Sequence, residues 1–183
     1  MTKELQKKIE IGIVIKQDIS ENQANSVFIG IGSNLGNKKE NIEKAKFKLN
    51  QNNIKILRSS SFYESFSWPN PKNPKFLNIV LDVKVHLDPI NLLKICKEIE
   101  IDLGRKKSYR NSPRKCDIDI IDFKKMVKND GICLPHPRMH QRNFVILPLF
   151  EICKDWVHPT TKHHIKRLIL SLSNRDISSI KQI

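Results

Sequence analysis

The stretch "FLNIVLDVKVHLDPINLLKICKEIEIDLG", residues 76–104, decides the fold, because it places the clearest strand of the chain directly before a capped helix. Its first half is rich in β-branched residues and alternates toward its end, which predicts a strand. Asp88 is a typical N-cap and Pro89 suits the first helical position, so we expect the helix to begin there. Gly104 suits the helix end. The core stripe follows helical spacing and comprises Leu92, Ile95, Ile99 and Leu103.

A second strand with two acids follows, after a basic loop, in "CDIDIIDF", residues 116–123. Side chains two apart share a face of a strand, so Asp117 and Asp119 project side by side, while Ile118 and Ile120 face a core. Two carboxylates so close repel each other, and a pair of divalent cations would remove the repulsion. Mg²⁺ is the natural choice beside phosphates. The alternative is that both acids are surface residues on the wet face of an edge strand.

The strand also holds a third acid, Asp122, of opposite parity near its end, which we expect to be solvated. N-terminal to the opening stretch, Val27 to Ile31 predicts a short apolar strand. The loop "GIGSNLGN" lacks the lysine of a Walker A sequence, so it is interpreted as a turn into a helix. Asn37 is the expected N-cap of that helix, with Glu40 as its capping-box partner. The apolar face of the helix comprises Ile42, Ala45 and Leu49.

The remaining segments complete an α+β prediction. Residues 54–65 alternate as one strand, and residues 66–75 hold three prolines and predict an irregular loop. The resulting order is β-α-β-β-α-β, the ferredoxin-like or split-βαβ arrangement, with helices packed on the sheet. Residues 147–159 and 163–173 predict additional C-terminal helical segments. We expect a single domain over residues 26–183 and an N-terminal extension of unknown role over residues 1–25, where residues 8–16 resemble an extra strand.

Charge and cysteine usage restrict the class of protein. Lysine and arginine exceed aspartate and glutamate by 33 to 19, a net charge of +14, which indicates either an anionic partner or a general lysine bias. Lysines are scattered, but five of the eight arginines fall within residues 105–142, where planar contacts to phosphate would be concentrated. The four cysteines form no C-x-x-C and are interpreted as reduced thiols in small apolar sites. The N-terminal apolar run is too short for a signal peptide, so we expect a cytoplasmic protein without a membrane segment.

Two further groups of residues suggest a ligand site. His136 and Arg142 lie around prolines that make a helical zinc pair of His136 and His140 improbable, so phosphate contact is the favoured interpretation. Phe76 begins the central strand with Asn78 on the same face, and a ring with an amide two residues on can stack and hydrogen-bond a flat heterocycle. Core packing is the alternative for these aromatic residues.

These pieces, in this order, resemble the 6-hydroxymethyl-7,8-dihydropterin pyrophosphokinase family over about residues 26–160. The matching motifs are "GSNLG" at residues 32–36, "SFY" at 61–63, "FLN" at 76–78, the "GR…R…PR…D-x-D" run at 104–119, and "PH…R-x-F…PLFEI" at 135–152. Five motifs in order are far more specific than one. The resemblance implies ATP-dependent transfer of pyrophosphate to the pterin hydroxymethyl oxygen, with release of AMP, in folate synthesis.

The resemblance also assigns roles to residues. It implies that Asp117 and Asp119 hold two Mg²⁺ ions, and that Arg105 and Arg114 join them as catalytic residues. The implied ATP contacts are Lys107, Arg110, Arg114, Ile120, Cys133, His136 and Arg142, with the main chain near Ile120 and Cys133 facing adenine. The implied pterin contacts are Ser65, Ser67, Trp68, Phe76, Asn78, Asp117 and Phe144. Residues 105–113 form the expected lid over ATP.

The chain departs from the family pattern at the proline pair of the pterin loop, where it has Phe66–Ser67, and at a basic-loop tryptophan, where it has Asn111. The chief rival is an RNA-recognition domain, which shares the element order and fits the charge. That class carries aromatics in an R/K-G-F-x-F-like run, which is missing, and exposed acids would repel the backbone of RNA. A second rival is a family member that binds without catalysis. We therefore expect an enzyme that takes small-molecule substrates, acts as a monomer, and binds neither nucleic acid nor membrane.

Overall fold

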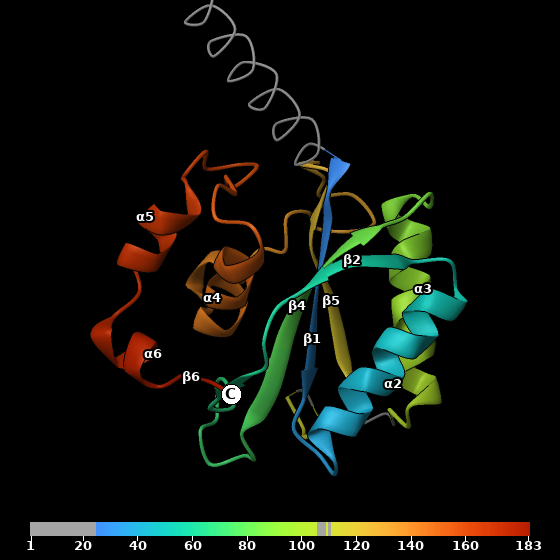
Figure 1. The fold of residues 1–183 in the computed structure, drawn as a ribbon, viewed down its shortest axis with the longest axis horizontal. Helices are drawn as coiled ribbons and strands as arrows, with labels where there is room; N and C mark the ends of the chain where they lie inside the picture. The colour runs from blue at the N-terminus through green and yellow to red at the C-terminus, as the bar shows by residue number, and fades with distance from the viewer. Residues whose placement is uncertain (1–24, 106–108, 110) are drawn as a thin grey trace, which may run out of the picture.

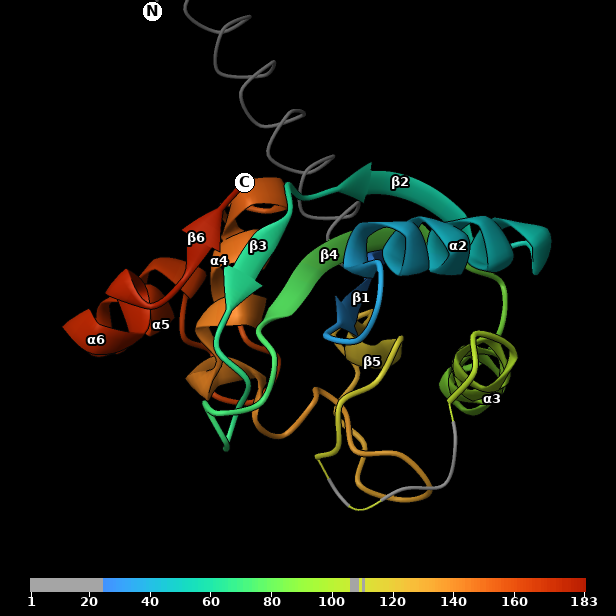
Figure 2. The ribbon, with the colours of Figure 1, turned by 90° about the horizontal axis from the view of Figure 1, so that it is seen from below.

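The protein is described from a computed structural model, which covers residues 25–105, 109 and 111–183. A six-stranded sheet lies between two layers of helices, with α2 and α3 on one face and α4 on the other (Figures 1 and 2). The predicted extension, apart from Asn25, and the possible strand at residues 8–16 lie outside the described residues.

The elements follow one another in the order β1 (Val27–Ser33), α2 (Lys38–Gln51), β2 (Lys55–Ser59), β3 (Tyr63–Ser65), β4 (Phe76–Lys84), α3 (Pro89–Asp102), β5 (Asp117–Phe123), η1 (Met139–Gln141), α4 (Asn143–Ile152), α5 (Ile165–Leu170), α6 (Asn174–Ser178) and β6 (Lys181–Gln182). The strands pair antiparallel in the order β5-β1-β4-β3-β6, and β2 also pairs with β4. The α+β class is confirmed. Between the two long helices there is one strand more than the sequence predicts.

The extra strand arises because residues 54–65 do not form one continuous strand. Ser60 interrupts it: its backbone N–H donates to Val80 O at 2.9 Å, and its Oγ accepts from Val80 N at 3.0 Å. The next residue, Ser61, donates its N–H and its hydroxyl to the Glu151 carboxylate of α4. Side-chain hydrogen bonds thus replace regular strand pairing at the serines, and β2 and β3 pair separately with β4.

The helix starts follow the predicted caps. The Asp88 carboxylate accepts from the backbone N–H groups of Ile90 and Asn91, and Asn37 Oδ1 accepts from Glu40 N. The Glu40 side chain pairs with Lys44 at 2.6 Å, so it does not act as the predicted capping-box partner.

Two apolar cores flank the sheet. One packs β1, β4 and β5 against α2 and α3, through residues such as Ile31, Ile42 and Leu92. The other packs Phe28 and Ile121 against α4, α5 and the fully buried Trp156. Each strand of the centre therefore contributes alternate side chains to opposite cores.

The prediction that Asp122 is solvated is wrong. Asp122 is fully buried and accepts hydrogen bonds from Trp156 Nε1 at 2.8 Å and Lys125 N at 3.0 Å, with Lys125 Nζ at 3.3 Å. The register between β1 and β5 shifts at Phe28 and Ile29, so that Asp122 pairs with Phe28 and shares its face. A β-bulge at this point reverses the parity that simple alternation gives. Burial raises the pKa of Asp122, against the opposing effect of Lys125.

The C-terminal segments are less helical than predicted. Helix α4 begins at Asn143 and ends at Ile152, so residues 153–159 of the first predicted segment are not helical. The second segment contains α5, and the chain then adds α6 and the short strand β6. Figure 2 shows β6 beside β3, where it extends the sheet.

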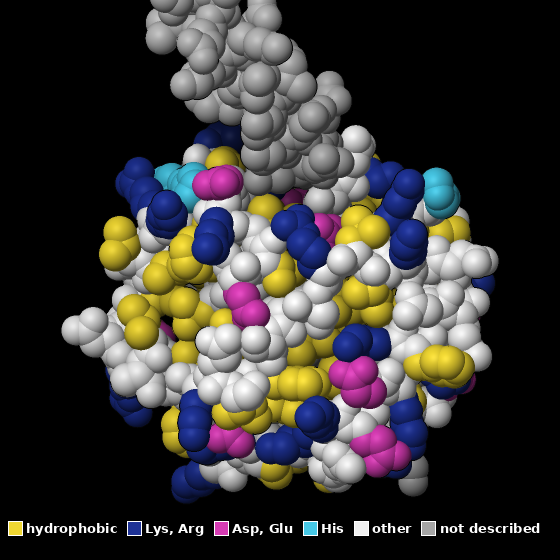
Figure 3. Space-filling view, viewed as in Figure 1, with side chains coloured by type: hydrophobic (Ala, Val, Ile, Leu, Met, Phe, Trp, Pro, Cys, Tyr) yellow, Lys and Arg dark blue, Asp and Glu magenta, His cyan; other side chains and the backbone are white. Residues whose placement is uncertain are grey.

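Surface features complete the description. All four cysteines are free, and three are buried as predicted, but Cys133 is exposed. On the face drawn in Figure 3, Lys and Arg side chains are scattered among acidic and apolar ones. Within the described ranges, we found no helix with the length and apolarity needed to cross a bilayer.

Candidate active site

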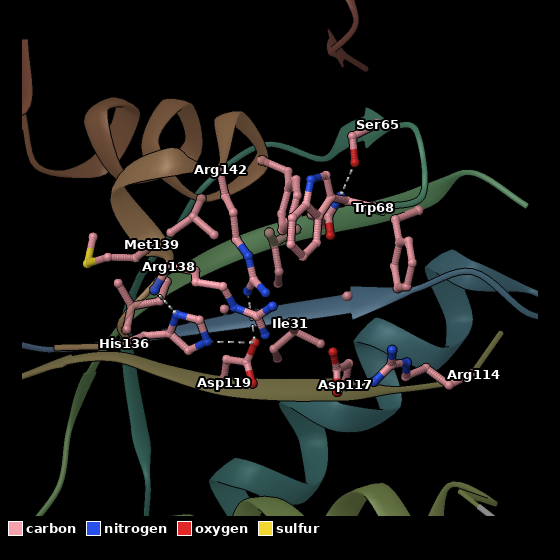
Figure 4. A pocket seen from close by; sticks show the side chains of 18 of the residues that line it. Ile31, Ser65, Trp68, Arg114, Asp117, Asp119, His136, Arg138, Met139 and Arg142 are labelled. Carbon is pink, nitrogen blue, oxygen red and sulfur yellow. Dashed lines mark hydrogen bonds and ion pairs between the residues drawn. The ribbon is translucent and has the colours of Figure 1, made fainter. Parts of the chain in front are cut away.

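A cavity of about 240 Å³ lies on the α4 face of the sheet, where β5, β1 and β4 meet the loops before β5 and α4 (Figure 4). It brings together most of the predicted site residues. Those that line it are Ser65, Trp68, Phe76, Asn78, Arg105, Arg114, Asp117, Asp119, His136, Arg142 and Phe144. Residues 40 or more apart in the sequence thus meet at one place, as the predicted site requires.

The first acid of the pair, Asp117, is held by two arginines. Its Oδ1 accepts from Arg105 Nη1 and from Arg114 Nη1, each at 3.1 Å. The Nε of Arg114 is buried and finds no partner among the described residues. Because an unpartnered guanidinium nitrogen is costly to bury, this end of the cavity is suited to an anionic ligand.

The second acid, Asp119, faces a different pair of side chains, Arg142 and His136. Its Oδ2 lies 3.6 Å from Arg142 Nη1 and 3.8 Å from His136 Nε2. Burial lowers the pKa of His136, Asp119 opposes the effect, and Arg142 and Arg138 reinforce it. Burial also lowers the pKa of Arg142, whose Nε has no partner in the described part of the chain. Each aspartate thus has basic side chains on one side and the cavity on the other.

Glycines form the floor opposite the acids. Gly32 pairs with Asp117 across the β1–β5 ladder, and Gly30 pairs with Asp119. A Cβ on Gly32 would lie 3.0 Å from Asn78 Oδ1 and 3.3 Å from Phe76 Cδ1, so only glycine leaves this part of the cavity open. The Gly-Ile-Gly alternation in β1 is the sequence signal that would have revealed this floor.

A buried acid outside the cavity, Glu100 of α3, positions Arg105. The Glu100 carboxylate accepts from Arg105 Nη1, from Lys97 Nζ at 2.7 Å and from Ile118 N at 2.7 Å. Burial lowers the pKa of Arg105, but the charges of Glu100 and Asp117 outweigh it and the pKa is raised. Sequence reasoning missed Glu100, although its position four residues after the buried Cys96 places it on the inward side of the helix.

The opposite end of the cavity is aromatic. Phe76 and Phe144 line it from β4 and α4, and Asn78 Nδ2 donates to Ser65 Oγ at 3.0 Å. The Trp68 ring lies over two guanidinium groups, with Arg138 at 5.2 Å and Arg142 at 5.8 Å from its centroid. Rings with a nearby amide can hold a flat, polar-edged heterocycle.

One carboxamide joins the loops around the cavity. Asn34, at the end of β1, donates its backbone N–H to Arg114 O at 3.1 Å and accepts from Arg114 N at 2.7 Å. Its Nδ2 donates to Pro74 O at 3.2 Å. The turn after β1 therefore holds both the loop before β5 and the proline-containing loop.

Five predicted contacts are not among the lining residues. Lys107 and Arg110, and with them much of the expected lid, lie outside the described residues. Ser67 is buried beside a neighbouring cavity, the Ile120 side chain faces the α2–α3 core, and Cys133 is exposed and contacts Asn129. Asn111 of the expected lid also lines the cavity. The lining residues that no predicted role included are Gly30, Ile31, Gly32, Phe66, Ile79, Lys97, Ile121, Arg138, Met139 and Val145.

Comparison with known proteins identifies a family. Residues 28–154 match the family of 7,8-dihydro-6-hydroxymethylpterin-pyrophosphokinase (HPPK). The chain is 35% identical over 133 residues to the 2-amino-4-hydroxy-6-hydroxymethyldihydropteridine pyrophosphokinase of Bacillus subtilis. The match covers 72% of the chain and 80% of that relative. It is 40% identical over 151 residues to the folic acid synthesis protein FOL1 of Dictyostelium discoideum, over 82% of the chain.

The chain spans only part of some relatives: the match covers 23% of the Dictyostelium protein and 22% of the folic acid synthesis protein of Pneumocystis carinii. Among solved structures, HPPK-DHPS of Plasmodium falciparum superimposes with a TM-score of 0.67 at 14% identity, over 87% of the chain and 48% of that structure. The last likeness concerns the fold. On the sequence match over residues 28–154, the chain belongs to the HPPK family.

Proposed function

We propose that the chain transfers a pyrophosphoryl group from ATP to the hydroxymethyl oxygen of 6-hydroxymethyl-7,8-dihydropterin and releases AMP, a step of folate synthesis. The observation that carries the proposal is one cavity with a carboxylate pair and arginines at one end and two phenylalanines with an amide at the other. Family membership supports it. The domain would be residues 26–183, with residues 1–25 an extension of unknown role.

The reaction forms a bond between the hydroxymethyl oxygen and the β-phosphorus of ATP. The bond from that phosphorus to the α–β bridging oxygen breaks, AMP leaves with the electron pair, and the hydroxyl proton is released. Such transfers depend mainly on positioning and on the stabilisation of charge. The chain must therefore hold the alcohol and the triphosphate in line.

Cations on the cavity wall would stabilise the phosphate charge. Arg105 and Arg114 lie beside Asp117, and His136 and Arg142 beside Asp119, so all four would face phosphate oxygens bound between the acids. The buried, unpartnered Nε atoms of Arg114 and Arg142 support this role. We propose further ATP contacts from Lys107, Arg110 and the main chain near Ile120 and Cys133.

The carboxylate pair fits magnesium. The described residues provide no cluster of three or more His, Cys, Asp or Glu side chains for a metal, but Mg²⁺ commonly uses one or two carboxylates and completes its shell with water and phosphate oxygens. In the described residues, Asp117 Oδ1 accepts from two arginines, and Asp119 Oδ2 lies near Arg142 and His136. Asp117 and Asp119 would hold two Mg²⁺ ions, which would neutralise charge on the triphosphate.

The aromatic end would hold the pterin. Phe76 and Phe144 would stack on its two faces, and Asn78, fixed by its hydrogen bond to Ser65, would contact its polar edge. Trp68 would cover the opening, and Ser67 would support the loop that carries it. A monomeric state and a cytoplasmic location stay predictions.

A coupled assay of AMP release with ATP, Mg²⁺ and the dihydropterin alcohol tests the proposal. We expect turnover by the wild type and a loss in kcat of at least roughly 10³-fold in Asp119→Ala, because the charge that organises the triphosphate is removed. Asp130→Ala, a change at an exposed acid, is the matched control. Wild-type protein that releases no AMP, or Asp119→Ala within about tenfold of wild type, contradicts the proposal.

A further inference from the structure

The C-terminal residues 173–183, here called the C-terminal strap, contact both walls of the aromatic end of the cavity. The strap contains α6 and β6 and lies beyond the residues that match the family. Its first contact is with α4, and its second is with β3 (Figure 2). The proposed function gives it no role.

The contact with α4 is made through a buried amide. Asn143 begins α4, between Arg142 and Phe144, and its Oδ1 accepts from Phe144 N at 2.7 Å. Its Nδ2 donates to Asp176 O at 2.5 Å and to Ser179 Oγ at 3.1 Å. The strap thus accepts the hydrogen bonds of the Asn143 amide, and Asn143 lies between Arg142 and Phe144 of the cavity wall.

The contact with β3 is a strand pairing. Tyr63 pairs with Gln182 and Glu64 with Lys181, and Ile183 N donates to Phe62 O at 2.9 Å. Gln182 Nε2 also donates to Ser61 Oγ at 3.0 Å. Strand β3 is only three residues long and ends in Ser65, the acceptor of the Asn78 side chain. Without β6, this short strand would form an open sheet edge.

A second cavity, of about 600 Å³, lies between the strap and the proline-containing loop. Five residues line both cavities and so form the partition between them: Ser65, Phe66, Trp68, Arg142 and Phe144. The strap side of the second cavity is formed by Arg175, Asp176, Ser178 and Ser179. The strap therefore stands one side-chain layer behind the aromatic wall.

We infer that the C-terminal strap is a positioning element that sets the spacing between β3 and the first turn of α4, and thereby the affinity for the pterin. The inference rests on the proposed function for the identity of the ligand. The triphosphate end depends mainly on β5, on Glu100 and on the loop before β5, whose printed hydrogen bonds in the described part of the chain do not involve the strap. Of the residues that the structure describes, Arg142 is the one proposed ATP contact that also borders the second cavity. Loss of the strap contacts should therefore weaken pterin binding more than binding of the ATP analogue.

A pair of neighbouring serines provides the test. Both hydroxyls donate to the carbonyl three residues earlier, Ser178 to Arg175 O and Ser179 to Asp176 O, but in the described part of the chain Ser179 Oγ also accepts from Asn143 Nδ2. We expect Ser179→Ala to raise the pterin Kd about two- to tenfold, the range for one neutral hydrogen bond. Ser178→Ala should match the wild type. Both Kd values are measured by calorimetry with a nonhydrolysable ATP analogue and Mg²⁺ present, and the analogue itself is titrated alone.

A truncation after Ser179, which removes β6, should raise the pterin Kd more than Ser179→Ala does. If the truncated chain fails to fold in a thermal melt, the comparison of the two serine variants decides alone. Equal changes in the Kd of pterin and of the ATP analogue, or an unchanged pterin Kd in Ser179→Ala, would overturn the inference. Neither result contradicts the proposed function. A wild-type protein that binds both ligands but releases no AMP would contradict the proposed function and leave the inference about the strap standing.

Discussion

Asp117 of β5 pairs with Gly32 of β1 across the sheet, so the acid that contacts two arginines lies opposite a residue without a side chain. The pairing keeps the space above β1 open between the acids and Phe76.

Gly32→Ala should impair pterin binding. The new Cβ would lie 3.0 Å from Asn78 Oδ1 and 3.3 Å from Phe76 Cδ1, so both side chains must shift. We expect the pterin KM to rise about tenfold or more, since overpacking costs about 1–3 kcal/mol. Gly30→Ala, whose Cβ would meet the flexible Ile121 side chain at 3.3 Å, should have the smaller effect in the same assay. The reverse ranking would contradict this description of the floor.

Arg114→Lys should reduce kcat more than it raises the pterin KM. A lysine retains the charge but loses the planar guanidinium, whose Nη1 contacts Asp117 and whose buried Nε is free to bind a ligand. We expect kcat to fall by roughly 10²-fold, as for removal of one donor to a developing charge. Arg167→Lys, at an exposed position of α5, serves as the control. A variant with wild-type kcat would show that Arg114 acts only as a charge.

Asp122→Ala should destabilise the fold without affecting the site directly. Trp156 Nε1 and Lys125 N would lose their acceptor, and Lys125 Nζ would lose its charged partner while keeping its hydrogen bond to Val157 O. We expect the free energy of unfolding, measured in urea, to fall by about 3 kcal/mol. KM values of the folded variant should stay at wild-type levels. Asp122→Asn, which keeps an acceptor for Trp156, should lose less, and equal losses would contradict the hydrogen-bond account.

His158 should make the fold sensitive to acid. Burial lowers its pKa to about 4, with contributions from His140 and Lys125, and its Nδ1 accepts from Thr160 N and Thr161 N. The unfolded chain binds this proton more readily, with a pKa near about 6.5. The stabilising contribution is therefore present above that pH and is lost as the pH falls toward 4.

Unfolding in urea across this pH range measures the effect. His158→Asn supplies a neutral acceptor in a similar place and should show a flatter dependence of stability on pH than the wild type. His86→Asn, at an exposed histidine that is not among the groups lowering the pKa of His158, should keep the wild-type slope. Parallel slopes in the wild type and His158→Asn would exclude His158 as the source.

The sequence was most informative where local chemistry decides the structure. Asp88 and Asn37 cap the helices they were expected to cap, since an N-cap depends only on its own turn. The acids of "DID" share a face because alternation holds over two residues. The five motifs in order predicted that Asp117, His136 and Phe76 share one site, and all three line the same cavity.

The misses have non-local causes. Asp122 was expected in solvent because the register shift between β1 and β5 has no signature in β5 itself. The strand at residues 54–65 divides because Ser60 and Ser61 bond to Val80 and Glu151, partners far away in the chain. Glu100 was assigned no role, because two of its three partners, Arg105 and Ile118 N, lie outside α3 and only the fold brings them to its carboxylate.

The Asn34 carboxamide has a mechanical consequence. Its Oδ1 accepts from Arg114 N and its Nδ2 donates to Pro74 O, while the Asn34 backbone N–H donates to Arg114 O. If the segment that carries Arg114 moves, these hydrogen bonds must break or the segment that carries Trp68 must move with it. Asn73 Nδ2, which donates to Asn111 O, joins the same two segments at a second point, so we expect the two sides of the cavity to move together.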